Sequence, residues 1–105
     1  MHVPPAHVHQ AQFMAAIARA AQSLAPDVVD IITALGNDWT GEPAVFFTVI
    51  LSDAAASKHD QLLNVANRAS SFIVRHVEPL EKWGVLPYFT YRSHAEQAKL
   101  EPSLA

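Results

Sequence analysis

Hydrophobic residues recur at helical spacing in the first quarter of the chain. The positions follow the i, i+4, i+7, i+11 pattern of one helical face: Phe13, Ile17, Ala20 and Leu24. Pro26 ends this pattern, because proline lacks the backbone N–H and clashes with the preceding turn. The spacing therefore predicts a helix from about residue 10 to residue 24.

A second and longer helical pattern lies in the C-terminal half. Its apolar positions stack on one side of a helix over residues 60–77: Leu62, Ala66, Ala69, Ile73 and Val77. Pro79 does not fit the interior of a helix, but it fits the first turn of a new one. We therefore expect a break near Glu78, followed by a short helical turn that ends at Gly84.

Three segments carry strand patterns. Residues 28–35 and 44–51 are rich in β-branched and aromatic residues, and a Gly-, Asn- and Pro-containing stretch over 36–43 connects them as an antiparallel hairpin. A third strand is expected over 85–91. Ser52 and Asp53 can cap the next helical segment, and the Ser93-x-x-Glu96 spacing of a capping box predicts a short helix to Leu100.

The element order is thus α-β-β-α-(α)-β. Helices and strands that segregate in this way predict an α+β fold, a two-layer sandwich of a three-stranded sheet with helices mainly on one face. Residues 10–100 are expected to form a single α+β domain. Residues 1–9, which contain three histidines and two prolines, are expected to be a flexible arm, and 101–105 a tail.

Composition narrows the class of protein. Half of the 105 residues are hydrophobic and 16% are charged, which is typical of a packed domain. The chain has no cysteine, so disulfides and thiol chemistry are excluded. Its longest apolar stretch, 44–51, is far shorter than the ~20 residues of a membrane-spanning helix. The start has no secretory signal pattern, and we expect a cytoplasmic protein with no membrane partner.

The pattern resembles a known family across residues 10–92. The hairpin ending at Leu51-Ser52-Asp53, the helix containing residues 67–73 and the aromatic third strand are similar to the type II KH-like fold, and within it to the ribosome-binding factor A family. This resemblance implies association with RNA or the ribosome. The G-x-x-G loop with which KH domains clamp RNA is replaced here by residues 77–80, Val-Glu-Pro-Leu.

A second resemblance is to small bacterial α+β proteins of unassigned function. It consists of the Asp-Trp-Thr-Gly-Glu-Pro turn over residues 38–43 and the Pro-Tyr-x-x-Tyr-Arg-Ser strand end over residues 87–93. It implies no function.

A basic stripe supports the RNA alternative. Three cations lie seven residues apart along the long helix and the short turn that follows it, and the third strand adds aromatic and basic side chains; the candidate RNA-binding set is Arg68, Arg75, Lys82, Tyr88, Tyr91 and Arg92. However, the formal net charge is −3, whereas nucleic-acid binders are typically basic. We therefore favour the interpretation of the stripe as a solvated helix face.

The residues with catalytic or metal-binding chemistry form no complete set. His2, His7 and His9 lack the further ligands that a metal site needs, and no metal or other cofactor is predicted. His76 could act as a base, but no nucleophile or carboxylate can be placed beside it, and we interpret it as a histidine at the edge of the core. An enzyme is not predicted.

The strand over 44–51 carries the strongest functional signal, because both of its faces are apolar. A continuous apolar strand is buried on both faces, and helices on one side leave the other side bare. Either the helices divide between the two faces or a second molecule covers the sheet, and we favour the second. We therefore predict a non-enzymatic interaction module, either a homodimer or half of a complex with a small protein partner, that uses this bare face.

The residues of the partner face follow from a small difference between the two sides. One side consists of Val45, Phe47, Val49 and Leu51, which Val28, Ile32 or their neighbours across the hairpin are expected to extend. The other is slightly less hydrophobic, and with the loop tryptophan it gives the candidate partner-binding set Trp39, Ala44, Phe46, Thr48 and Ile50. Trp39 is equally consistent with an interface anchor and with a ring folded over Phe46 or Tyr88.

Overall fold

The computed structural model describes residues 3–100, without the side chain of His59. Along the chain the elements are α1 (Pro5–Val8), α2 (Gln10–Ser23), β1 (Val28–Asn37), β2 (Pro43–Leu51), α3 (Asp53–Ala56), α4 (His59–Val77), α5 (Pro79–Trp83), β3 (Leu86–Ser93) and α6 (His94–Leu100). The α+β class, the hairpin and the order of the main elements are confirmed.

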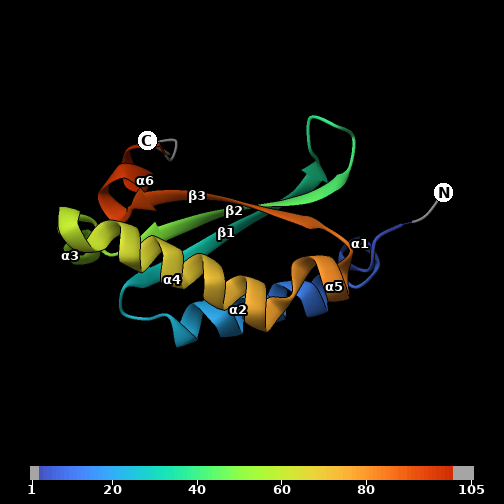
Figure 1. Cartoon of the computed structure of the whole chain (residues 1–105), viewed down its shortest axis with the longest axis horizontal. Coiled ribbons are helices and arrows are strands. Elements are labelled where there is room, and N and C mark those ends of the chain that lie inside the picture. The colour runs from blue at the N-terminus through green and yellow to red at the C-terminus, as the bar shows by residue number, and fades with distance from the viewer. Residues whose placement is uncertain (1–2, 101–105) are drawn as a thin grey trace, which may run out of the picture.

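A three-stranded sheet in the order β1-β2-β3 forms the middle of the molecule. β1 and β2 pair antiparallel, with Ala34 opposite Phe46, whereas β2 and β3 run parallel, with Phe46 opposite Tyr88. The helices α2 and α4 cover one face of this sheet, as Figure 1 shows, and the short helix α6 lies on the other face. Most of that other face is therefore left without a helical layer.

The hydrophobic core lies between the sheet and the α2–α4 layer. Phe13 and Ile17 of α2 and Ile73 of α4 are buried there, beside Phe47 of β2. The rings of Phe47 and Phe89 stack at a centroid distance of 5.3 Å across the parallel pair. The side of β2 that contains Val45, Phe47, Val49 and Leu51 therefore meets the helices.

The capping residues and the helix break predicted from the sequence are present in the structure. Ser52 Oγ accepts a hydrogen bond from the Ala55 N–H at the start of α3. At α6, the Glu96 N–H donates to Ser93 Oγ at 3.0 Å while the Ser93 N–H donates to Glu96 Oε1 at 3.2 Å, which is a reciprocal capping box. Glu78 adopts a left-handed conformation, with φ of 54°, and this separates α4 from α5.

The N-terminal segment differs from the expected loose arm. Pro5–Val8 form a helical turn, and both Pro4 and Ala6 are buried. Pro4 and Pro5 lie against Gly84, where an added Cβ would stand only 3.1 Å from the Pro5 ring. Sequence patterns missed this packing because its partner, at the end of α5, is distant in the chain. The predicted tail, 101–105, and His2 lie outside the described residues.

Two side-chain placements were wrong. The pairing of β1 with β2 is irregular between Val28 and Asp30, so that Val28 and Ile31 face the core while Ile32 points to the opposite face. His76 is exposed and not at the edge of the core; its ring lies 4.1 Å from that of Phe72, as measured between centroids.

No helix within residues 3–100 is long and apolar enough to cross a membrane.

Candidate interaction surface

The sheet face opposite α2 and α4, hereafter the open face, is largely apolar. It is formed by alternate residues of the three strands, and its main members are Ile32, Ala34, Phe46, Thr48, Tyr88 and Thr90. Ile32, on the edge strand β1, is 40% exposed, and Phe46, on the central strand β2, is 39% exposed. Large apolar side chains on a sheet are buried when a second layer covers that face of the sheet. The exposure of Ile32 and Phe46 therefore shows that this part of the face has no cover.

An aromatic cluster occupies the hairpin end of the open face. The Tyr88 ring stacks on Phe46 at 5.5 Å and meets the edge of Trp39 at 5.4 Å, as measured between centroids. Trp39 nevertheless remains 82% exposed. It therefore contacts Tyr88 without being covered by it, and most of the indole is available for a further contact.

The hairpin loop that carries Trp39 is held in shape by Asp38. Its Oδ1 accepts hydrogen bonds from the Thr40 hydroxyl at 2.6 Å, the Thr40 N–H at 2.9 Å and the Glu42 N–H at 3.0 Å. Its other oxygen, Oδ2, accepts the Tyr88 hydroxyl at 2.8 Å. Gly41 supplies the positive φ, 89°, that this tight turn requires.

These contacts shift the pKa values of both groups. The Thr40 hydroxyl, followed by Tyr88 and the two backbone N–H groups, lowers the pKa of Asp38 to about 2, against a smaller opposing effect of desolvation. The carboxylate in turn raises the pKa of Tyr88, because the hydrogen bond requires the phenol proton. At neutral pH the loop is therefore attached to β3 by a bond from a neutral phenol to a carboxylate.

The helix α6 closes the opposite end of the open face. It is attached to the sheet by Arg92, whose guanidinium donates to Gln97 Oε1 at 3.1 Å, and to α3 by the Ala95 N–H, which donates to Asp53 Oδ1 at 3.0 Å. Between α6 and the strands lies a pocket of about 400 Å³. Its walls include Asp30, Ile32, Ile50, Asp53, His94 and Gln97.

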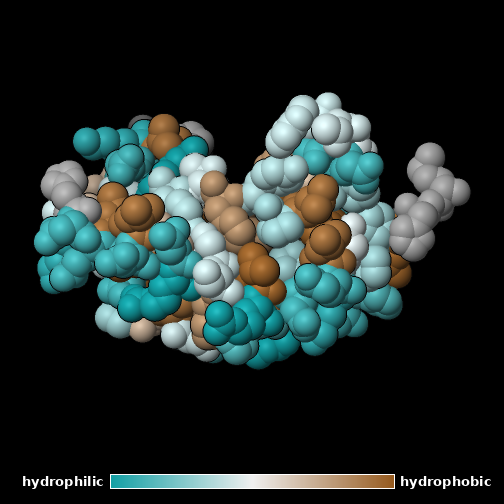
Figure 2. All heavy atoms as spheres, in the orientation of Figure 1, coloured by the Kyte–Doolittle hydropathy of each residue, from teal (hydrophilic) through white to brown (hydrophobic). Residues whose placement is uncertain are grey.

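The open face is therefore a saddle. The hairpin loop rises above the sheet at one end and α6 rises at the other, as seen in Figure 1. In the space-filling view of Figure 2 the outline of the molecule is hollowed between these two ridges. An apolar floor between two ridges can receive a protein element that projects into it.

The predicted partner-binding residues lie on this face, but they are not equally accessible. Phe46, Thr48 and Trp39 reach its surface, whereas Ala44 and Ile50 are already buried within the single chain. Sequence reasoning placed Ile32 on the opposite side of the sheet, and it did not include Tyr88 in the partner-binding set. Ile32 lies opposite Thr48 because of the irregular pairing near Val29, which the sequence pattern of β1 does not show.

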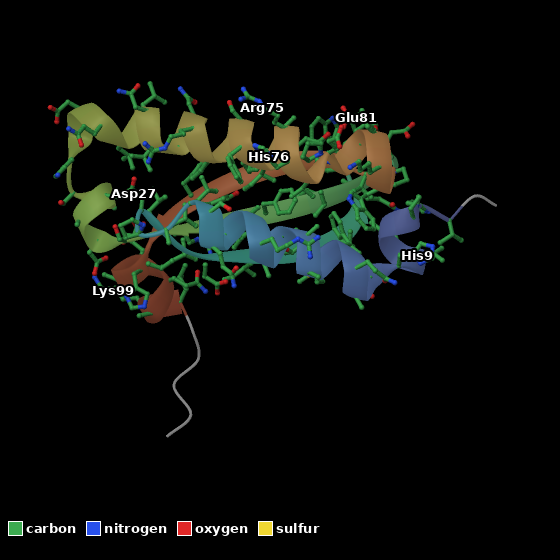
Figure 3. All side chains as sticks on the ribbon, turned by 90° about the horizontal axis from the view of Figure 1, so that it is seen from below. His9, Asp27, Arg75, His76, Glu81 and Lys99 are labelled. Atoms are coloured by element: carbon green, nitrogen blue, oxygen red, sulfur yellow. The ribbon has the colours of Figure 1, made fainter. Side chains whose placement is uncertain are left out.

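The candidate RNA-binding residues are divided between two sides of the molecule. Arg68 and Arg75 are on α4, whereas Tyr88 and Arg92 face the open side of the sheet. Figure 3 shows Arg75 directed away from the sheet. Two cations of the set are also paired, Arg68 with Asp27 and Lys82 with Glu78.

Tyr91 belongs to the helix side. Its hydroxyl donates to the Ala66 carbonyl oxygen at 2.9 Å, and burial raises its pKa. It is therefore engaged with α4 and is not presented beside Tyr88.

Among residues 3–100, no group of three or more His, Asp or Glu side chains is arranged to hold a metal ion.

Comparison with known proteins gives no relative: no family model, no curated protein and no solved structure matches this chain.

Proposed function

We propose that this chain is a non-enzymatic interaction module whose open face binds a second copy of the same chain. The observation that carries the proposal is the combination of exposed Ile32, Phe46 and Trp39 on one face of an otherwise covered sheet. Association would remove these side chains from water, at roughly 25 cal/mol for each Å² of apolar surface buried.

A protein partner would have to contact more than the floor of the sheet. A stable interface covers about 800 Å² on each side. An exposed aromatic ring supplies at most roughly 150–250 Å². The sheet floor alone is therefore too small, and an adequate contact has to include the hairpin loop and α6 as well. A second copy meets this requirement, because it brings the same two ridges.

The test is the mass in solution as a function of concentration. We expect light scattering or sedimentation at tens to hundreds of micromolar to give about twice the monomer mass of 11.5 kDa, and dilution to return the monomer. A mass that stays at that of the monomer over this range would overturn the proposal.

Two matched variants show whether the open face is responsible. Phe46→Glu places a charge on the open face, and we expect it to give a monomer at every concentration tested. Leu63→Glu places the same charge at an apolar residue that is more exposed, at 68%, but lies on α4 in the helix layer. We expect it to leave the dimer intact, and the opposite pattern would place the interface on α4.

The RNA-associated alternative stays a prediction. The separation of Arg68 and Arg75 from Tyr88 and Arg92, together with the two ion pairs, gives it less support than the open face has. If it held, RNA affinity would fall steeply with salt, and Arg75→Glu would abolish it.

A further inference from the structure

We propose that the two chains associate reciprocally, with Trp39 of each protomer inserted into the pocket beside α6 of the other. This inference rests on the proposed self-association and adds the residues that meet and the orientation of the two sheets.

Trp39 has the properties of an interface anchor. It is the most exposed large hydrophobic residue within residues 3–100, at 82%. Tryptophan is among the residues most often found at the centre of protein interfaces. The four hydrogen bonds of Asp38 and the edge contact with Tyr88 fix the loop before any partner arrives. A side chain that is already positioned loses less entropy on binding.

The pocket offers what an indole needs. The pocket lies on the same face as Trp39 but at the opposite end of the strands. It has a volume of about 400 Å³, and Ile32 and Ile50 form its apolar wall. Within residues 3–100 the Trp39 N–H has no hydrogen-bond acceptor. Asp30 and Asp53 each place a carboxylate at the pocket, and each uses one oxygen for a backbone N–H, of Ile31 and Ala95 respectively. The second oxygen of either can accept the indole N–H.

Symmetry makes this contact occur twice. Two identical faces stack about a two-fold axis that lies between them, directed either along the strands or across them. An axis along the strands brings hairpin against hairpin and α6 against α6. An axis that runs across the strands, nearer to the hairpin end, brings the hairpin of one protomer to the inner side of α6 of the other. Each hairpin loop then enters the hollow of the facing saddle beside α6. Only the second arrangement joins each Trp39 to a pocket.

The absence of cysteine from the chain allows a direct test by disulfide trapping. Glu42→Cys labels the hairpin and His94→Cys labels the pocket; both side chains are exposed, and neither takes part in a side-chain hydrogen bond of the described residues. The two single variants are mixed at a concentration where the protein is dimeric and then oxidised. We expect mainly the mixed E42C–H94C dimer, identified by mass, and little E42C–E42C.

A second mixture of cysteine variants controls for disulfides that form when two chains collide by chance. Gln61→Cys is exposed on α4, outside the open face, and its mixture with Glu42→Cys is expected to give little cross-linked product. If light scattering shows a dimer but E42C–E42C dominates, or no mixed product forms, the inference falls while the proposed self-association stands. If the unmodified chain is a monomer throughout, the proposed function falls with it.

A second variant tests the anchor without a disulfide. Trp39→Ala is expected to weaken dimerisation at least tenfold, with a far-UV spectrum like that of the unmodified chain, because the ring is mostly exposed in the protomer. Unchanged dimerisation in this variant would also overturn the inference.

Discussion

Phe46 and Phe47 are neighbours in the sequence and have the same side chain, but they stand in opposite environments. Phe47 has no exposed surface and packs in the core, where its ring stacks on Phe89. Phe46 points to the open face and stacks on Tyr88, with more than a third of its surface still exposed. The two residues share a strand and a hydrogen-bond ladder, so the difference between them comes from what covers each face.

This contrast teaches how a strand pattern should be interpreted. Alternation of side chains assigns Phe46 and Phe47 to different faces, but both faces of β2 are apolar, so alternation alone does not say which is inside. For Phe47, the layer of α2 and α4 covers its face of the sheet and places the ring inside the core. For Phe46, only part of a cover is present within residues 3–100, and under the proposed self-association a second chain completes it.

Phe47→Ala is expected to have the largest effect. Removing a fully buried ring costs about 3–5 kcal/mol of folding free energy, because transfer energy is lost and a cavity remains. Denaturant titration followed by circular dichroism should show this loss at every protein concentration. A loss that disappears at high concentration would mean that Phe47 contributes to the interface.

Phe46→Ala is expected to reverse that pattern. A partly exposed ring contributes less within the protomer, so we expect about 1–2 kcal/mol when the protein is dilute. The unmodified chain should melt at a higher temperature as its concentration rises, because association stabilises the folded state by mass action. This dependence should weaken or disappear in the variant. Equal concentration dependence in both proteins would contradict the assignment.

Much of the fold could be predicted because its signals are local. Helical spacing placed α2 and α4 to within a residue or two, Pro79 located the break, and the Ser93–Glu96 pair located the start of α6. The orientation of β2 could also be anticipated, since Thr48 and Ala44 made one side slightly less hydrophobic. Each of these inferences needed only residues that are close in the sequence.

The parts that could not be predicted depend on contacts between distant segments. The irregular pairing near Val29 moved Ile32 to the open face, and it arises from how β1 meets β2 and not from the pattern of β1 itself. The buried Ala6 depends on α5, and the bond between Asp38 and Tyr88 spans fifty positions. The pocket beside α6 likewise requires residues from β1, β2, α3 and α6, which no single pattern connects.

Tyr88→Phe is expected to have a smaller effect that separates loop order from ring packing. The variant keeps the ring that stacks on Phe46 and removes only the hydroxyl that donates to Asp38. The fold should remain, whereas the loop should lose its attachment to β3, and dimerisation should weaken by less than in Trp39→Ala. Trp39 fluorescence anisotropy, taken as the difference from a Trp39→Phe protein, should fall in the monomer. Unchanged anisotropy would show that the turn around Asp38 holds Trp39 without Tyr88.

Acidification is expected to have the smallest effect, and it should reach the hairpin end through Asp38. The pKa of Asp38 is lowered from 3.8 to about 2 in the folded chain, so folding favours its charged form. Its stabilisation of the loop is therefore fully present above pH 3.8 and is lost as the pH falls through about 2. Across this window, the Trp39 signal of the dilute monomer should change before the far-UV spectrum does. The Asp38→Asn variant, which has no carboxyl group to titrate at this position, should show no such early change. If both proteins respond alike, the early transition belongs to other carboxylates, and Asp38 is not the group that holds the loop.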